Sequence, residues 1–476
     1  MATPKASADT LRESLRALLP PEALLLSAED QEPYLIDHRR LYHGRALAVA
    51  LPDSVAQVCA LLAWCHERRI GVVPQGGNTG YCGGATADES GTQLVVALRR
   101  LNRIRAIEPA NFSMTVEAGC VLANVQDAAA QADRFFPLHL GAEGSCQIGG
   151  NLATNAGGLN VLRFGMMREL VLGVEAVLPD GRLYEGLSAL RKNNTGYDLA
   201  SLLIGSEGTL AVLTAATLKL WPRMRSTATA FIAIADVDAA VRVLGLLRES
   251  CGERLNSFEL LPRIAIELTV RHIPGVVDPF DKPHLWYLLC ELSSAEPEPL
   301  DELLGQVLTG ATESGLILEA LLATGERQRL AFWKLREEIP EAQRRAGPSV
   351  KHDISVPVAA VPAFVREGSA WIKQHVPEGT LVGYGHAGDG NLHFNVSFLR
   401  PTGAADAKRR EAELRRAIHD LVQSFGGSIS AEHGIGRLKV AELARYASPV
   451  KLAAMRAIKN ALDPHGIMNP GKVLSV

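Results

Sequence analysis

Two histidines beside a tight turn carry the strongest chemical signal in the sequence. The segment GHAGDGNLHFN (385–395) places His386 and His393 seven residues apart. Asp389-Gly390 is a favoured two-residue hairpin turn. A turn there would pair the two histidines directly across the strands, with Cβ atoms about 5 Å apart. This geometry predicts chelation of one divalent metal ion; the competing interpretation is that both imidazoles only pack or form hydrogen bonds.

Glycines cluster in three loops, PQGGNTGYCGGA (74–85), GAEGSCQIGGNLATNAGG (141–158) and NNTGYDLASLLIGSEGTL (193–210). Glycine lets the backbone turn with positive φ and approach a ligand closely, and successive N–H groups in such turns bind anions. Neutral donors in the loops are Asn78, Thr79, Asn151, Thr154 and Asn155. The loops therefore predict binding of a pyrophosphate and the edge of a ring system, against the alternative that they are only tight turns.

Two standard nucleotide motifs fail on their context. GYGHAG (383–388) matches G-x-G-x-x-G, but a hairpin follows it where a dinucleotide-binding fold needs a helix. GIMNPGKV (466–473) nearly matches the P-loop, but Val473 replaces the required Ser or Thr. Both matches are interpreted as chance.

Longer motifs show a family resemblance. PQGGNTG, GSCQIGGNLATNAGGLNVLRFG and GSEGTL resemble the flavin-binding loops of the FAD-linked oxidase family that includes vanillyl-alcohol oxidase. GHAGDGNLH and SAEHGIGR extend the likeness to its D-2-hydroxyglutarate and D-lactate dehydrogenase branch. The resemblance implies an α+β fold with a PCMH-type FAD-binding domain, an α/β cap (substrate) domain with an antiparallel sheet, and a helical C-terminal segment.

The implied domains are residues 1–222 for FAD, 223–427 for substrate, and 428–476 completing the FAD and active sites. FAD is expected to be non-covalent, because the first loop has no histidine; His139, before the second loop, is taken as structural. The FAD-binding residues implied are Pro74, Gly76, Gly77, Asn78, Thr79, Gly80, Gly83, Gly84, Gly144, Ser145, Gly149, Gly150, Asn151, Thr154, Asn155, Gly157, Gly158, Gly205, Glu207, Gly208 and Asn469.

The resemblance also completes the metal site. It supplies Glu432 as a third ligand beside His386 and His393, a set that suits catalytic Zn²⁺ or Mn²⁺ with positions open for substrate. His433 follows Glu432 and is the candidate catalytic residue, because an imidazole suits a general base near neutral pH. The alternatives for His433 are a further metal ligand or a hydrogen bond to flavin.

Substrate contacts are implied at Arg336 and Lys351, with Asn395 on the face of the histidines and His433 at the hydroxyl. An Arg holds a carboxylate bidentately and a Lys acts as a point charge, so two cations fit a dicarboxylate better than lactate. Pro340 departs from the pattern, since the hydroxyglutarate branch commonly has a hydroxyl residue there.

The elements that must position these residues follow from periodicity. Ser54 caps a predicted helix with an apolar face. Strands are predicted at 71–77, 94–98, 114–119 and 209–222, with a hairpin at 174–186. From about residue 225 an antiparallel sheet covered by helices on one side is predicted. Its strands are 227–235, 284–293 and 350–357 and the hairpin 381–398; its helices are 238–249, 298–314 and 361–375.

Composition limits the partners. Net charge is −3 from 49 basic and 52 acidic residues, which gives no reason to expect nucleic acid or an anionic membrane. Seven cysteines without a C-x-x-C pair indicate reduced thiols and a cytoplasmic location. The N-terminus mixes charges without a signal-like apolar core, and no apolar stretch reaches the ~18 residues of a transmembrane helix.

The predicted activity is FAD- and metal-dependent oxidation of a D-2-hydroxy acid, most simply D-2-hydroxyglutarate, by hydride transfer to flavin. Electrons would pass to an electron-transfer flavoprotein or a quinone, and a homodimer is possible. The alternatives are a D-lactate dehydrogenase, or a glycolate- or D-malate-oxidising relative, of the same family; an oxidase that uses O₂; and a non-catalytic flavin-binding protein.

Overall fold

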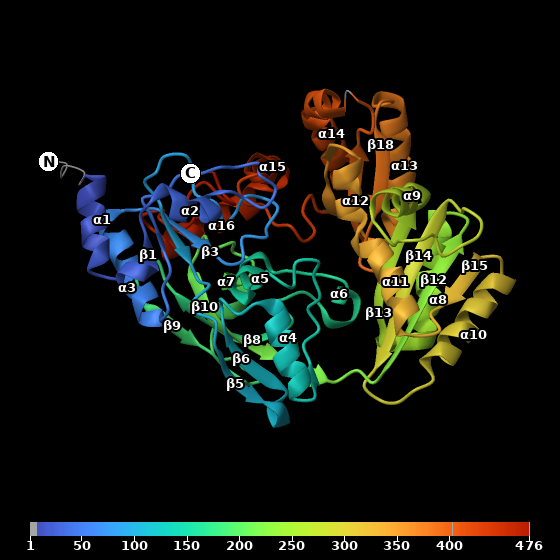
Figure 1. Ribbon diagram of the computed structural model, residues 1–476, viewed down its shortest axis with the longest axis horizontal. Coiled ribbons are helices and arrows are strands. Elements are labelled where there is room, and N and C mark those ends of the chain that lie inside the picture. The colour runs from blue at the N-terminus through green and yellow to red at the C-terminus, as the bar shows by residue number, and fades with distance from the viewer. Residues whose placement is uncertain (1–6, 402, 476) are drawn as a thin grey trace. The chain divides into compact units, whose positions relative to one another are not determined.

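The computed structural model describes residues 7–401 and 403–475, which form two compact units (Figure 1). The first comprises the described residues up to Gly158, Gly165–Arg223 and those from Glu432 onward; the second comprises Leu159–Phe164 and Met224–Ala431. The predicted division into FAD and substrate domains stays a prediction. Residues 1–6, which bear on the leader prediction, lie outside the described residues. None of the described helices is long and apolar enough to cross a lipid bilayer.

Two main sheets build the first unit. One has the order β1-β2-β4-β3, in which β2 and β3 both run parallel to β4; the other is antiparallel with the order β5-β6-β10-β8-β9. The strands are β1 (Leu24–Leu25), β2 (Ala48–Ala50), β3 (Val72–Gln75), β4 (Leu94–Ala97), β5 (Ile104–Glu108), β6 (Ser113–Glu117), β8 (Val171–Val177), β9 (Leu183–Gly186) and β10 (Val212–Lys219), with β7 (Arg134–Phe135) and β11 (Trp221–Pro222) as a separate pair. The predicted strands and the 174–186 hairpin are confirmed.

Five helices of the first unit, α1, α2, α3, α7 and α16, begin at a side-chain cap. The Ser54 side chain accepts from the Gln57 N–H and starts α3 (Val55–Arg68), as predicted. Its apolar face packs in one hydrophobic core with the fully buried strands β2 and β4 and with the buried valines of β3. The other helices are α1 (Ala8–Arg16), α2 (Ala28–Leu35), α4 (Leu122–Gln131), α5 (Ile148–Thr154), α7 (Leu199–Leu203), α15 (Val440–Tyr446) and α16 (Pro449–Leu462).

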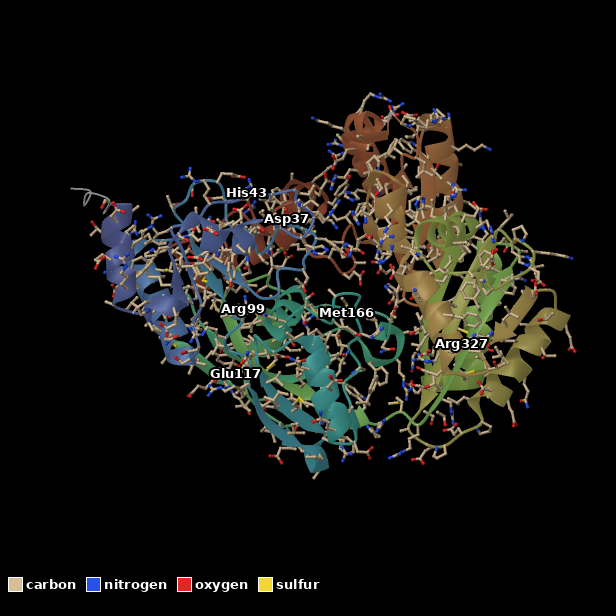
Figure 2. All side chains as sticks on the ribbon, viewed as in Figure 1. Asp37, His43, Arg99, Glu117, Met166 and Arg327 are labelled. Carbon is tan, nitrogen blue, oxygen red and sulfur yellow. The ribbon has the colours of Figure 1, made fainter. Side chains whose placement is uncertain are left out.

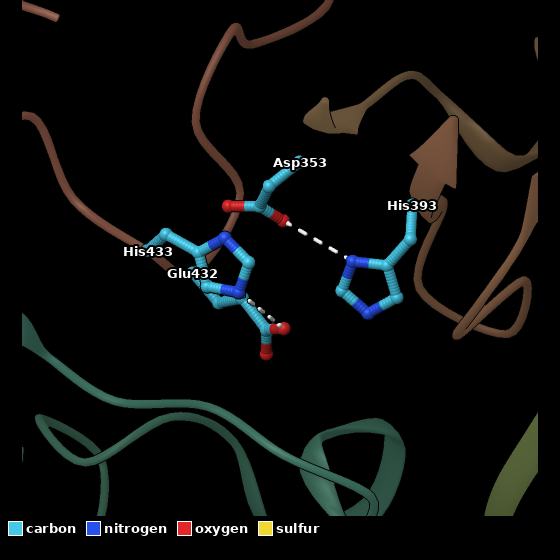
Figure 3. Close-up of side chains that lie close together, drawn as sticks. All are labelled: Asp353, His393, Glu432 and His433. Atoms are coloured by element: carbon cyan, nitrogen blue, oxygen red, sulfur yellow. Dashed lines mark ion pairs between the residues drawn. The ribbon is translucent and has the colours of Figure 1, made fainter. Parts of the chain in front are cut away.

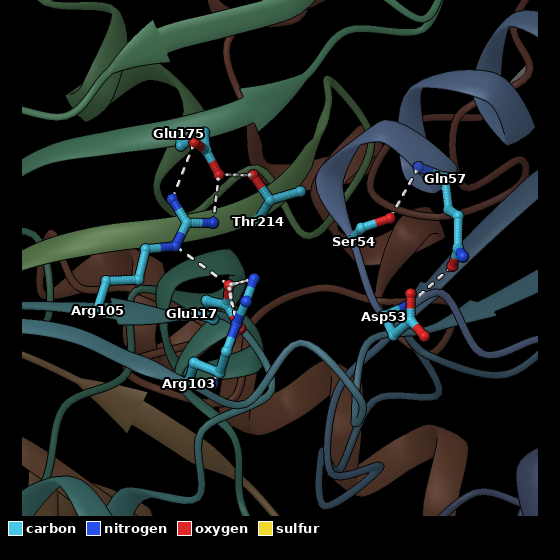
Figure 4. Close-up of polar contacts among 8 residues, drawn as sticks. All are labelled: Asp53, Ser54, Gln57, Arg103, Arg105, Glu117, Glu175 and Thr214. Atoms are coloured by element: carbon cyan, nitrogen blue, oxygen red, sulfur yellow. Dashed lines mark hydrogen bonds and ion pairs between the residues drawn. The ribbon is translucent and has the colours of Figure 1, made fainter.

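A charged network on the antiparallel sheet of the first unit contains two buried carboxylates, Glu117 and Glu175 (Figure 4). Glu117 is 0% exposed and accepts from Arg103 and Arg105, and Arg105 also holds Glu175. Burial by itself raises the pKa of Glu117, but the hydrogen bonds from the two arginines outweigh it and leave this pKa below its usual value. Glu117 directly precedes Ala118, and Gly149 of the second glycine loop packs against Ala118.

The second unit contains two antiparallel sheets. The first has the order β13-β14-β12-β15; in the second, β17, β16 and β18 all pair with β19. Their bounds are β12 (Ser226–Ile234), β13 (Leu255–Pro262), β14 (Trp286–Ser294), β15 (Ile317–Leu322), β16 (Ser349–Val350), β17 (Asp353–Ser355), β18 (Thr380–Tyr384) and β19 (Asn391–Ser397). The predicted strand at 350–357 is therefore two short strands, and β13 was not predicted.

Helices cover both faces of the β12–β14 region, so the prediction of one-sided cover is wrong. Phe231 and Leu289 pack with α9, α11 and α12 in one core, while α8 and α10 contact the same strands outside that core. The alternate residues Ile232 and Cys290 are also 0% exposed, and a sheet buried on both faces needs helices on both. The helices are α6 (Val161–Phe164), α8 (Val237–Cys251), α9 (Arg263–His272), α10 (Leu300–Glu313), α11 (Glu326–Glu337), α12 (Ile339–Ala346), α13 (Val361–His375) and α14 (Gly403–Ser424).

Candidate active site

The predicted FAD-binding glycines fall into two groups. Gly77 and Gly149 are required for packing, because a Cβ would lie 2.2 Å from the Ser145 carbonyl oxygen and 2.8 Å from the Ala118 Cβ, respectively. In contrast, a Cβ added at Gly80, Gly144 or Gly150 would meet nothing within 4 Å. These three leave open space beside the backbone, which is the arrangement that a closely approaching ligand needs.

Buried amide oxygens in the same region lack partners. The side-chain oxygens of Gln147, Asn151 and Asn469 are buried and accept no hydrogen bond from the described residues. An unsatisfied buried acceptor is costly, so these atoms fit a ligand that brings N–H or O–H donors. Together with the open glycines they fit the pyrophosphate and polar ring edge of FAD.

Glu207 and Asn469 hold loops together. The largely buried Glu207 carboxylate accepts from the backbone N–H groups of Ile435 and Gly436, both at 2.7 Å. Burial raises its pKa, and these two hydrogen bonds only partly offset the rise. The Asn469 amide donates to the carbonyls of Gly84 and Glu207, both at 2.8 Å. Glu207 therefore joins the third glycine loop to the segment that carries the candidate base. Asn469 instead joins the first glycine loop to the third.

Other predicted flavin residues also engage their own loops. The Asn78 amide donates to the Ile36 carbonyl and the Thr154 hydroxyl to the Gly150 carbonyl. The Asn155 side chain accepts from the Arg168 N–H and donates to the sulfur of Met166, which Figure 2 labels. These contacts fix the shape of the loops; the flavin contacts remain a prediction.

The hairpin that carries the two histidines differs from the predicted one. The partner of His393 across the ladder is Tyr384 rather than His386. The predicted two-residue turn is wrong, because the pairing of β18 with β19 stops at Tyr384. The next residue, Gly385, pairs instead with Leu260 of β13 through hydrogen bonds of 2.9 and 3.0 Å. Residues 385–390 therefore form a six-residue connection.

The two imidazoles nevertheless lie close together. The ladder is shifted by two residues, which leaves the facing of side chains unchanged, and the ring centroids of His386 and His393 are 5.7 Å apart. Two imidazoles on one tetrahedral Zn²⁺, bound through nitrogen at about 2.1 Å, would have centroids about 5 Å apart. The pair therefore fits a shared metal ion.

A buried carboxylate joins His386 to Arg336. Glu259 in β13 is 0% exposed; its Oε1 lies 2.5 Å from His386 Nδ1, and its Oε2 accepts from Arg336 Nε at 2.5 Å. Burial favours the neutral acid, but Arg336 and His386 outweigh it and lower the pKa of Glu259 to about 2. The Arg336 guanidinium also lies 4.9 Å from the centroid of the Tyr384 ring. With Nδ1 engaged by Glu259, Nε2 is the nitrogen through which His386 would bind a metal ion; its role as a ligand remains a prediction.

Asp353 and the Glu432-His433 pair lie near His393 (Figure 3). Asp353 pairs with His393 across β17 and β19, and its Oδ1 is 4.0 Å from His393 Nδ1. The Asp353 carbonyl also accepts from the Ala431 N–H, so chain connectivity brings Glu432 close to it. Asp353, His393, Glu432 and His433 each offer one ligand atom, all within 4.8 Å of one another. This set includes two predicted ligands and adds Asp353; His386 is outside it.

The segment after Glu432 is anchored to the first glycine loop. The His433 ring lies edge-on to Tyr81 with centroids 4.7 Å apart, and the Cys82 carbonyl accepts from the Arg437 N–H at 2.8 Å. Gly436 fits only as glycine, because its φ is +52° and a Cβ would lie 2.2 Å from the Cys82 oxygen. The candidate base is thereby held against a predicted flavin loop.

The remaining substrate candidates lie around β19. The Asn395 oxygen accepts from the His352 N–H, and its amide donates to Gln343, so this side chain already has two partners. Lys351 lies between β16 and β17. Pro340 stands in the first turn of α12, where its missing N–H costs no helical hydrogen bond.

The sequence reasoning missed Glu259 and Asp353. Each is the lone acid in a short β-prone run, SFELLP or HDISVP. Because an unpaired carboxylate inside a sheet is expensive, such an isolated acid indicates a buried cationic partner or a metal. That signal was available, although it does not identify the partner.

Comparisons with known proteins identify the family to which both parts of the chain are similar. Residues 46–186 match the family model described as FAD binding domain, and residues 223–473 match FAD linked oxidases, C-terminal domain. The D-2-hydroxyglutarate dehydrogenase of Xanthomonas citri pv. viticola is 37% identical, covering 97% of this chain and 96% of the relative. The mitochondrial enzyme of that name from Arabidopsis thaliana is 37% identical, covering 92% and 77%.

A solved structure shows the same fold. p-Cresol methylhydroxylase (PCMH) with substrate bound superposes with a TM-score of 0.77 at 16% identity, covering 98% of this chain and 96% of that one. At this identity the likeness concerns the fold alone, and it confirms the predicted PCMH-type α+β architecture.

Proposed function

This chain belongs to the FAD-linked oxidase family, and from that membership we propose that it is an FAD-dependent dehydrogenase that oxidises D-2-hydroxyglutarate to 2-oxoglutarate. The names of the 37%-identical relatives support this substrate. The observation that carries the proposal is that Arg336, His386 and His393 meet in the second unit, joined through Glu259 and Tyr384. A carboxylate binder thus lies beside a pair of metal-ligating side chains.

The residues divide the work of binding and proton transfer. His386, His393 and Glu432 would hold a divalent ion, Zn²⁺ or Mn²⁺, with Asp353 as a further candidate ligand; such an ion supplies Lewis acidity at the 2-hydroxyl. Arg336 and Lys351 would bind the two carboxylates. His433 would accept the proton of the 2-hydroxyl at a ring nitrogen.

The glycine loops would bind FAD, which supplies the hydride acceptor for the C2 hydrogen. The loop that carries His433 is bonded to the first glycine loop through Cys82, so proton acceptor and flavin would keep a fixed relation. Electrons would leave for a separate carrier, an electron-transfer flavoprotein or a quinone.

Steady-state kinetics with an artificial dye acceptor tests the substrate. We expect kcat/KM for D-2-hydroxyglutarate to exceed that for D-malate and, by a larger factor, that for D-lactate, because Arg336 and Lys351 provide two cations. A preference for D-lactate would contradict the proposal. Rapid reoxidation of the reduced protein by O₂, within one turnover, would identify an oxidase instead.

A further inference from the structure

We propose that Glu259 is a positioning residue that orients the metal ligand His386 and the carboxylate binder Arg336 together. The inference rests on the proposed function, because it assigns roles to these two partners. The proposed role is indirect, because Glu259 of β13 acts through its two neighbours His386 and Arg336.

Both oxygens of the Glu259 carboxylate are engaged by these two partners. Glu259 is 0% exposed, and its two oxygens have different partners, Oε1 toward His386 Nδ1 and Oε2 toward Arg336 Nε, each at 2.5 Å. His386 and Arg336 are themselves only 8% and 5% exposed. Neither partner can be reoriented without leaving the carboxylate half-satisfied in a dry environment.

The backbone makes this meeting unavoidable. Residues on both sides of Glu259 bind the histidine segment: Leu260 exchanges two hydrogen bonds with Gly385, and the Phe258 carbonyl accepts from the Gly388 N–H. Gly385 has φ +150°, and a Cβ there would lie 2.7 Å from the Asn391 carbonyl oxygen. The hydrogen bonds of Phe258 and Leu260 therefore fix the position of His386 next to Glu259.

The chemical consequence is different at each end. A carboxylate on Nδ1 fixes the tautomer and ring orientation of a ligating histidine and raises the basicity of Nε2. At the other end, the Nε contact and the Tyr384 ring, 4.9 Å from the guanidinium, fix the plane of Arg336. A fixed plane is what bidentate recognition of a carboxylate requires. One side chain therefore links metal affinity to substrate affinity.

A purely structural role predicts something different. If Glu259 only neutralised Arg336 inside the fold, its loss would lower stability without changing the intrinsic affinity for metal. Glu291 in the neighbouring β14 provides a matched control. Among the described residues, this largely buried carboxylate accepts hydrogen bonds from Thr229, Arg329 and Trp333, and none of these three is a predicted site residue.

The experiment compares Glu259→Gln with Glu291→Gln. Each purified flavoprotein is stripped with a chelator, and Zn²⁺ alone is titrated in against a chromophoric competitor. We expect Glu259→Gln to bind Zn²⁺ roughly 10–100-fold more weakly and to raise KM for D-2-hydroxyglutarate, whereas Glu291→Gln should match the unsubstituted protein in both. Glu259→Asp keeps the charge beside Arg336 and should fold if the glutamine variant does not; its shorter reach should also weaken Zn²⁺ binding.

The outcomes separate the two proposals. Equal Zn²⁺ affinity in the unsubstituted protein and a folded Glu259 variant would overturn the positioning role and leave the proposed function intact. Absence of Zn²⁺ and Mn²⁺ binding by the unsubstituted protein would overturn the metal role and, with it, this inference. A comparable loss of Zn²⁺ affinity in Glu291→Gln would show that the effect is general destabilisation and would also overturn it.

Discussion

Replacing Glu207 with glutamine should loosen the segment that carries His433. The carboxylate accepts from two backbone N–H groups, those of Ile435 and Gly436, each at 2.7 Å. Hydrogen bonds to a charged group contribute about 1.5–3 kcal/mol each, and a neutral one about 1 kcal/mol. Glutamine keeps one acceptor and turns an NH₂ group toward the other N–H, so one bond weakens and the other is lost.

The magnitude follows from these terms and from burial. Weakening one bond costs about 1 kcal/mol, and leaving one N–H unsatisfied costs about 1–3 kcal/mol. Removing the charge offsets part of this loss of stability, because burial raises the pKa of Glu207 and so disfavours its ionised form. We therefore expect a loss of about 2 kcal/mol, the lower end of the range.

Urea unfolding at pH 7 measures the loss of stability, and kcat with a dye acceptor measures the looser placement of His433. Glu89→Gln is the matched control, because Glu89 pairs with Arg437 of the same segment from a solvent-exposed position, where an ion pair contributes little. A Glu207→Gln protein with the unfolding midpoint and kcat of the unsubstituted protein would refute the reasoning.

Four further predictions concern other parts of the chain. Glu117→Gln should make the free energy of unfolding depend less on pH in the acid range. The folded-state pKa of Glu117 is lowered, so its stabilisation is fully present above the unfolded pKa near 4.5 and is lost as pH falls through the lower folded-state pKa. Urea unfolding midpoints between pH 7 and pH 3 would reveal the difference. Gly385→Ala should weaken Zn²⁺ binding and lower the unfolding temperature, because its Cβ would strike the Asn391 carbonyl; unchanged values in both assays would contradict the packing. His433→Ala should lose most turnover and keep its yellow flavin absorbance, and near-normal kcat would exclude the base role. EDTA should inactivate the protein and Zn²⁺ or Mn²⁺ should restore it, with full activity in a metal-free sample ruling out the metal.

Local signals in the sequence predicted most elements correctly. The Ser54 cap, the 174–186 hairpin and the strand at 227–235 depend on neighbouring residues alone, and the structure confirms all three. The histidine pair was also brought together as expected, although by a different ladder. The predicted pairing of His386 with His393 was wrong because Gly385 can pair with either β19 or β13. The sequence does not show which of the two strands it pairs with.

Long-range pairing explains what was missed. Glu259 meets its partners across sequence separations of 77 and 127 residues, and no periodicity extends that far. Likewise, the prediction of helices on one face overlooked β13 and the apolar residues on both sides of β12. The amide of Asn395 was assigned to substrate from its face alone, whereas its hydrogen bonds to His352 and Gln343 depend on tertiary packing; its substrate role stays a prediction.

The insertion of the second unit into the first has a consequence for synthesis on the ribosome. Strand β3 is at the edge of its sheet, and its Val72 N–H reaches the Ile467 carbonyl only after the whole second unit has been translated. During that interval the nascent chain carries an uncovered edge strand, the kind of surface that recruits other strands. The Asn469 amide reaches Gly84 across 385 residues, so the first glycine loop also lacks this hydrogen bond until the second unit has been translated. Such incompletely paired intermediates are prone to aggregation.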